Sequence, residues 1–319
     1  MSYTAQPVGF LAETIQRIYD YANEPSDNPK WTSDKLFNLI RGSWARAMND
    51  VNTLGKDPIV VRYDIPVTNS QKTYLLPCNV GQILSFGKVE PQTGEFYEVI
   101  LPRSRLNPCG GGVLFEGNLV RFEPSWPSSE TLRILYIPSG DFVCHLGTFA
   151  ASDTGVSTTK FPISLSPTEG YFDRRPNGYI GSVVRLLSCV DGSSNPVNPS
   201  GYGYFPIQER PIVSVAGTSR LATVDPAFDF DPASLTGGTV TYEIVPFLGQ
   251  LFQEAVAWDV AAIIHGTEGR PNDKKDAWNN KAQQMRTIRS NLSGYNARTG
   301  SLLRGDIPGT GRYGWVAGL

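Results

Sequence analysis

The residues of this chain best suited to chemistry are its two histidines and four cysteines. Cys144 and His145 are adjacent, and a cysteine paired with a histidine base can become a thiolate nucleophile. They lie in a predicted strand, however, where neighbouring side chains point to opposite faces. We therefore interpret both as structural. His265 ends a predicted helix, where its ring suits the free carbonyl groups of the last turn better than a metal ion.

Three aspartates could in principle hold a hard cation. Asp225, Asp229 and Asp231 lie close together in the sequence, and Ca²⁺ prefers carboxylate oxygens. The spacing lacks the glycine turn and the terminal glutamate of a calcium loop, while Pro226 and Pro232 favour a plain turn after a strand. We therefore predict no metal site.

The rest of the sequence contains no catalytic or cofactor motif that we recognise. The glycine-rich run at 109–112 is not followed by Lys-Ser/Thr or by a helix, so it predicts a flexible turn and not a phosphate-binding loop. Neither a Gly-x-Ser-x-Gly elbow nor a His-Glu-x-x-His zinc motif is present. We predict no catalytic residue, no cofactor and no enzymatic activity.

Composition limits the possible partners. The chain has 319 residues, a formal net charge of −2 and only 18% charged residues, so no basic surface large enough to hold nucleic acid through its phosphates is expected. The cysteines lack CxxC spacing, which favours reduced thiols. We recognise no signal peptide and no stretch near the roughly 20 apolar residues of a membrane span, so no membrane partner is predicted.

Two strongly patterned helices are expected to organise the fold. The first, near 248–264, is apolar around most of its circumference, and the second, near 273–292, carries one apolar stripe. Two further helices are predicted near the N-terminus, at 10–23 and at 33–54. Such helices need partners from this chain or from identical neighbours. The residues predicted to lie in the helical core or between subunits are Trp44, Leu251, Phe252, Trp258, Trp278 and Met285.

Between the helical pairs, short apolar runs broken by Pro, Gly and Asn predict strands. The first set of predicted strands lies near 59–65, 72–76, 82–89, 95–101, 112–116, 118–123 and 131–137. The second set lies near 179–187, 211–216, 220–224 and 240–245. We therefore predict an α+β fold, in which residues 1–138 and the helical hairpin 247–293 form a body with a helical bundle. Residues 139–246 form an inserted all-β domain that resembles a barrel or sandwich.

The last segment, 294–319, is predicted to be an extended arm, because it is rich in glycine and shows no apolar period. Apolar anchors and guanidinium groups on a flexible segment suit docking along a partner's groove. The arm residues expected to dock are Arg298, Leu302, Leu303, Arg304, Ile307, Arg312, Tyr313 and Trp315.

Several patterns together resemble a known family. An amphipathic helix at 36–54 leads into a strand, and residues 74–77 open a β segment. A hairpin strand over 116–124 ends in Phe-x-Pro, a strand over 132–136 ends in Tyr, and a helix closes the region at 251–264. In this order they are similar to the head-to-tail connector, or adaptor, proteins of tailed bacteriophages. Within 139–246, the strand patterns resemble a small β module that recurs in phage virion proteins.

The resemblance implies a structural protein of the virion head–tail junction, assembled in the host bacterial cytoplasm. It implies a ring of twelve identical subunits that contacts the portal protein and the next neck or tail protein, with DNA as a passing, non-specific partner. The arm would be the portal-binding segment. The alternative is a peripheral neck or tail protein whose β module binds a receptor or carbohydrate.

Overall fold

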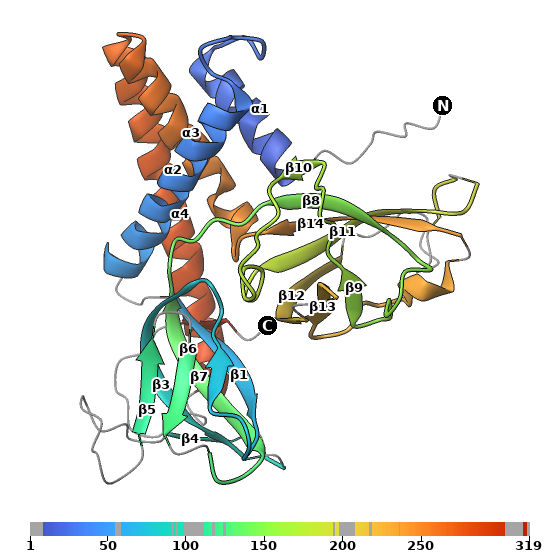
Figure 1. Cartoon of the computed structure of the whole chain (residues 1–319). Coiled ribbons are helices and arrows are strands. Elements are labelled where there is room, and N and C mark those ends of the chain that lie inside the picture. Colours follow the sequence, from blue (N-terminus) through green and yellow to red (C-terminus); the bar gives the residue numbers. More distant parts are fainter. Residues whose placement is uncertain are drawn as a thin grey trace. The chain divides into compact units, whose positions relative to one another are not determined.

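The computed structural model describes residues 9–54, 59–90, 92–93, 95–98, 112–116, 119–123, 126–193, 195–197, 208–216, 219–235, 237–303 and 315–317. These residues form four α-helices and three β-sheets, so the chain belongs to the α+β class (Figure 1). None of the helices within these ranges is both long and apolar enough to cross a membrane.

The two N-terminal helices lie close to the predicted ranges. Helix α1 spans Phe10–Ala22 and ends at Asn23, whose left-handed backbone (φ 53°) lets its amide bond back to the last turn. Helix α2 spans Ser33–Leu54, and the carbonyl of Thr32 accepts its first hydrogen bond, from the amide of Leu36 at 3.0 Å. The capping residues and the apolar period in the sequence therefore define both helices.

The C-terminal helices are longer than predicted. Helix α3 spans Gly249–Thr267 and helix α4 spans Pro271–Leu303. The predicted end of the hairpin at 293 is wrong, because α4 continues for ten more residues. No proline interrupts the chain between Pro271 and Pro308, and a glycine inside a helix costs only about 1 kcal/mol. Gly294 therefore does not stop the helix.

A seven-stranded antiparallel sheet follows residue 144 (Figure 1). Its order is β10-β8-β14-β11-β12-β13-β9. The strands are β8 His145–Ala150, β9 Lys160–Pro162, β10 Glu169–Gly170, β11 Val183–Val190, β12 Gln208–Val215, β13 Leu221–Val224 and β14 Thr239–Val245, with a short 3-10 turn at Pro232–Ser234. The sequence did not predict β9 and β10, because strands of two or three residues are too short to show alternation.

The other two sheets come from residues 59–138 and from the end of the chain. A five-stranded sheet has the order β15-β1-β7-β3-β4, and a three-stranded sheet has the order β2-β6-β5. The strands are β1 Ile59–Val67, β2 Thr73–Leu75, β3 Val80–Val89, β4 Phe96–Glu98, β5 Gly112–Glu116, β6 Leu119–Glu123, β7 Glu130–Pro138 and β15 Trp315–Ala317. Six of the seven strands predicted here differ from the observed bounds by at most two residues at either end. The predicted hairpin pairs β5 with β6.

The chain forms two compact units. Within the described residues, the first unit comprises 9–47 and 141–286, and the second comprises 48–140 and 287–317. The prediction grouped the helices with 59–138 and set 139–246 apart, whereas α1 and α3 share the first unit with the seven-stranded sheet. One reason is the buried carboxylate of Glu243 on β14, which accepts a 2.7 Å hydrogen bond from the amide of Phe10 at the start of α1.

This grouping predicts that residues 59–138 are dispensable for the fold of the first unit. Asn52 on α2 donates to the carbonyl of Pro138 at 3.0 Å, so the ends of that segment already lie together and a short Gly/Ser linker can replace it. We expect the shortened protein to unfold cooperatively and to keep its helical circular dichroism. Replacing 141–245 instead should leave α1 and α3 without their partner sheet and give an unfolded chain. The opposite pair of results would contradict the grouping.

Candidate functional site

Cys144 and His145 do not form a catalytic pair. The His145 ring is buried, with Nε2 3.0 Å from the Tyr242 hydroxyl and Nδ1 3.3 Å from the Tyr179 hydroxyl. Burial lowers the pKa of His145 to about 4, and burial raises the pKa of the Cys144 thiol well above its ordinary value. The His145 ring is therefore neutral and lies between two tyrosines, and the Cys144 thiol is protonated. Both side chains are part of the packed core, as the strand pattern predicted.

The three aspartates do not converge on a cation site. Asp229 forms an ion pair with Arg210 at 2.6 Å, and Asp231 accepts from the amide of Ala233 at the start of a 3-10 turn. In the part of the chain that the structure describes, no three His, Cys, Asp or Glu side chains gather to hold a metal ion. The glycine-rich run lies outside the described residues except for Gly112, which begins β5.

His265 has a different role from the predicted helix cap. Its Nε2 lies 3.2 Å from the carbonyl oxygen of Tyr21, so it joins α3 to the end of α1 instead of satisfying the last turn of its own helix. His265 lies in the last turn of α3, which ends at Thr267, but its ring contact is with α1.

A buried carboxylate joins three helices of the first unit. Asp259 on α3 accepts from Arg46 of α2 at 2.7 Å and from Lys281 of α4 at 2.9 Å. Burial alone would raise the pKa of Asp259, but the hydrogen bonds from Arg46 and Lys281 outweigh it and lower the pKa. Charged Asp259 therefore favours the packed arrangement of the helices.

Aromatic rings add to the same helical contact. Tyr21 of α1 stacks on Trp258 of α3 with ring centroids 3.9 Å apart, and its hydroxyl donates to Glu254 at 2.5 Å. Trp44 of α2 packs edge-on against Phe252 of α3, at 5.3 Å. The N-terminal and C-terminal helices therefore bind each other through Trp44, Phe252 and Trp258, which the sequence analysis had selected, and through Tyr21, which it had not.

The structure places most of the predicted core residues of the helices as expected. Trp44, Phe252 and Met285 are buried, and Leu251 and Trp258 are half-buried. Trp278 is the exception. It is 51% exposed, because the buried stripe of α4 begins at Ala277, and the ammonium of Lys274 lies 4.5 Å from the Trp278 ring centroid. Trp278 is therefore not part of the core of this chain, and its predicted place between subunits stays a prediction.

The arm residues lie in different elements. Arg298, Leu302 and Leu303 belong to α4, so an extended arm from 294 is not what the structure contains. Arg304, Ile307, Arg312 and Tyr313 lie outside the described residues. Trp315 begins β15, whose backbone pairs in parallel with Ile59–Val61 of β1.

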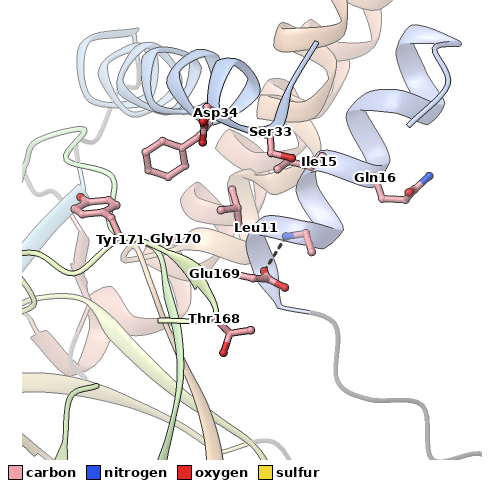
Figure 2. A pocket seen from close by; sticks show the side chains of 11 residues that line it. Leu11, Ile15, Gln16, Ser33, Asp34, Thr168, Glu169, Gly170 and Tyr171 are labelled. Atoms are coloured by element: carbon pink, nitrogen blue, oxygen red, sulfur yellow. Dashed lines mark hydrogen bonds between the residues drawn. The ribbon is translucent and has the colours of Figure 1, made fainter. Parts of the chain in front are cut away.

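A pocket with a volume of about 540 Å³ opens between α1, the start of α2 and the segment that contains β10 (Figure 2). Leu11 and Ile15 of α1 and the rings of Phe37 and Tyr171 supply its apolar walls, with these two ring centroids 5.6 Å apart. The remaining lining residues are Ala12, Gln16, Ser33, Asp34, Thr168, Glu169 and Gly170. All of these residues belong to the first unit.

The charge of the pocket is acidic. Asp34 and Glu169 are the charged residues that line it, and Glu169 accepts from the amide of Ala12 at 3.2 Å, as Figure 2 shows. Tyr171 has its pKa raised to about 12, first by burial and then by Asp173 and Asp141. An apolar pocket with two carboxylates suits a cationic group that also carries an apolar surface.

Sequence reasoning did not find this pocket. Its two halves are more than a hundred residues apart, and β10 has two residues, so no local pattern predicted that Thr168–Tyr171 would face α1. The apolar face of 10–23 was the only available signal, and it indicated burial and not an open wall.

Comparisons with known proteins do not assign the site. No protein-family model matches the chain, and no curated protein is significantly similar to it. Among solved structures, the crystal structure of Xanthomonas campestris FlgL shares 12% sequence identity with the chain at a TM-score of 0.13. That match covers 93% of this chain and 87% of that chain. A TM-score this low carries no argument about fold or function.

Proposed function

We propose that this chain is a structural virion protein that forms the adaptor, or connector, ring between the portal and the next neck or tail protein of a tailed bacteriophage. It acts through protein contacts, without catalysis, cofactor or metal. In the proposal, twelve identical copies surround a channel through which DNA passes. The ring assembles in the bacterial cytoplasm and belongs to the head–tail junction.

The order of the elements is the observation that carries the proposal. Two helices come first, then β1 to β7, then β8 to β14, and two helices end the described body. Asp259 links α2, α3 and α4, so helices from opposite ends of the chain meet. This order is the one for which the sequence resembles connector proteins. The proposal includes a bundle formed by these helices and a β module inserted between them.

Two further features support the proposal. The formal net charge of −2 suits a channel along which DNA slides, because tight binding needs many cationic contacts with phosphates. Exposed Trp278 gives the first unit a large aromatic surface group, and such groups are frequent where protein chains meet.

Imaging the assembled neck tests the proposal most directly. Cryo-electron microscopy of virions, or of the purified chain mixed with portal, should show a closed ring on the portal axis. Peripheral trimers or spikes would support the alternative, a neck or tail protein whose strands within 145–245 bind a receptor or carbohydrate. Virions that lack the chain at the head–tail junction would overturn the adaptor proposal.

The segment after α4 is predicted to hold the portal. The helix continues to Leu303, so the informative cut removes 304–319, which include Arg304, Ile307, Arg312 and Tyr313. We expect this truncation to leave the body folded and to abolish co-sedimentation with portal-bearing heads, because the anchors and guanidinium groups are lost.

A matched variant separates the effect of these four side chains on attachment from the effect of losing β15. Replacing those four side chains by serine keeps Trp315–Ala317 available to pair with β1, and it should fail to attach just as the truncation does. Heads that acquire either protein, and then a tail, would contradict the assignment of this segment.

A further inference from the structure

We propose that Trp278 of one copy inserts into the pocket between α1, α2 and β10 of a second copy, and that this is the contact by which subunits join. The inference builds on the proposed ring and names the two surfaces that form it. We call Trp278 with Lys274 and Lys275 the knob, and the cavity lined by Leu11, Ile15, Asp34, Phe37, Glu169 and Tyr171 the acidic pocket.

The knob combines a large apolar surface with positive charge. Trp278 is 51% exposed on α4, and Lys274 stacks on its ring. Lys275 lies three residues before Trp278 and is exposed, so on a helix it borders the same surface. Ala282, one turn further along the helix, is also exposed. An exposed tryptophan flanked by lysines is a group that a partner chain can bury.

The acidic pocket has the complementary chemistry. Leu11, Ile15 and the rings of Phe37 and Tyr171 offer apolar contact, and Asp34 and Glu169 supply two carboxylates at its border (Figure 2). In the described part of the chain, neither carboxylate forms an ion pair, and neither do Lys274 and Lys275. An inserted indole would therefore place ammonium groups and carboxylates together, with the apolar ring against the rings of the pocket.

The pocket is large enough to admit an aromatic side chain. Its volume of about 540 Å³ falls within the roughly 300–1,000 Å³ of sites that bind whole small molecules, so an indole with part of one lysine stem fits. The rings of Phe37 and Tyr171 contact each other edge-on. Aromatic rings favour edge-on and offset contacts, so an inserted indole can pack against this pair in the same way.

The two surfaces are different, which allows the contact to join subunits head to tail. No residue of α4 lines the pocket, so a copy carries one knob and one acidic pocket on separate elements of its first unit. Contacts between unlike surfaces join subunits head to tail, which gives a closed ring when the rotation closes and a filament when it does not. Two reciprocal knob-and-pocket contacts between the same two copies would instead stop at a dimer.

The experiment is sedimentation velocity of the full-length protein over a concentration series, at low and at moderate salt. The knob variant is Trp278→Ala, and the pocket variant combines Ile15→Lys with Asp34→Lys. Tyr97→Ala removes an aromatic ring that is 54% exposed on the second unit, and it serves as the control. Thermal unfolding of each variant, followed by circular dichroism, shows that it is folded.

We expect the unmodified protein and Tyr97→Ala to associate over the same concentration range. Both should associate more weakly at higher salt, because screening weakens the charged contacts. The knob and pocket variants should each remain monomeric at concentrations at least tenfold higher. An equimolar mixture of the two variants should give dimers and nothing larger, because it retains one intact knob and one intact pocket.

Other outcomes separate the inference from the ring proposal. If folded knob or pocket variants associate like the unmodified protein, the inference is overturned and the ring proposal is unaffected. A mixture of the two folded variants that stays monomeric has the same meaning. An unmodified protein that is monomeric throughout the series also overturns the inference. Open filaments that depend on Trp278 would support the contact and argue against a ring.

Discussion

Replacing Trp44 by alanine is expected to lower the free energy of unfolding by about 3–5 kcal/mol, the usual cost of truncating a large buried aromatic residue. The Trp44 side chain is 1% exposed and lies 5.3 Å from the ring of Phe252 and 5.9 Å from that of Phe142, measured between centroids. Its loss removes contacts between α2, α3 and the segment before β8 and leaves a cavity that these elements cannot close without moving.

Trp278→Ala is the matched control for this prediction. The same atoms are removed from a side chain that is half exposed, so the monomer should lose at most about 1 kcal/mol. Chemical denaturation of both variants, at a concentration where the protein is monomeric, measures the difference. Similar losses for the two tryptophans would mean that their burial in the helices is misassigned.

Replacing Asp259 by alanine is expected to lower the free energy of unfolding by about 3 kcal/mol. The variant leaves the Lys281 ammonium, 18% exposed at its side chain, without its counter-ion, and removing one partner of a buried ion pair usually costs about 3–5 kcal/mol. The lower end applies here, because the Arg46 side chain is 51% exposed and can turn to water.

The effect of Asp259 should depend on pH in a stated direction. The folded state lowers the pKa of Asp259, so the carboxylate contributes stability above the ordinary pKa that it has in the unfolded chain. That contribution is lost as the pH falls through the lower, folded pKa. The difference in unfolding free energy between the unmodified protein and Asp259→Asn should therefore shrink between pH 7 and pH 3.

Asp276→Ala is the control for the loss of a carboxylate from this region. Asp276 is exposed on α4, so its removal should change the free energy of unfolding by less than about 0.5 kcal/mol at every pH. If the difference in unfolding free energy between Asp259→Asn and the unmodified protein stays constant with pH, then Arg46 and Lys281 do not lower the pKa of Asp259.

Much of the fold could be predicted from local sequence. The apolar period of α2 and the Gly and Pro residues that follow it predicted the observed start and end of this helix. Period-two runs predicted β1, β5, β6 and β7 to within about two residues. These signals are local because caps, turns and amphipathic faces act over one or two turns of chain.

Two kinds of feature could not be predicted: which face of a helix is buried, and which residues far apart in the sequence make contact. On α4, one stripe begins at Trp278 and another at Ala277, and the apolar pattern admits both, since a tryptophan can pack or project. Lys281 resolves the choice by reaching Asp259 on α3, a partner that no local period reveals. The pocket depends in the same way on α1 meeting β10, and the grouping of the units depends on Glu243 meeting Phe10.

The pairing of β15 with β1 has a consequence for solubility. Trp315–Ala317 lies along Ile59–Val61 at one edge of the five-stranded sheet, with β7 on the other side of β1. A bare sheet edge presents unpaired amide and carbonyl groups that recruit strands of other molecules. Trp315–Ala317 therefore cover this edge, and proteolytic cleavage after α4 would expose the amide and carbonyl groups of β1 to strands of other molecules, which favours aggregation.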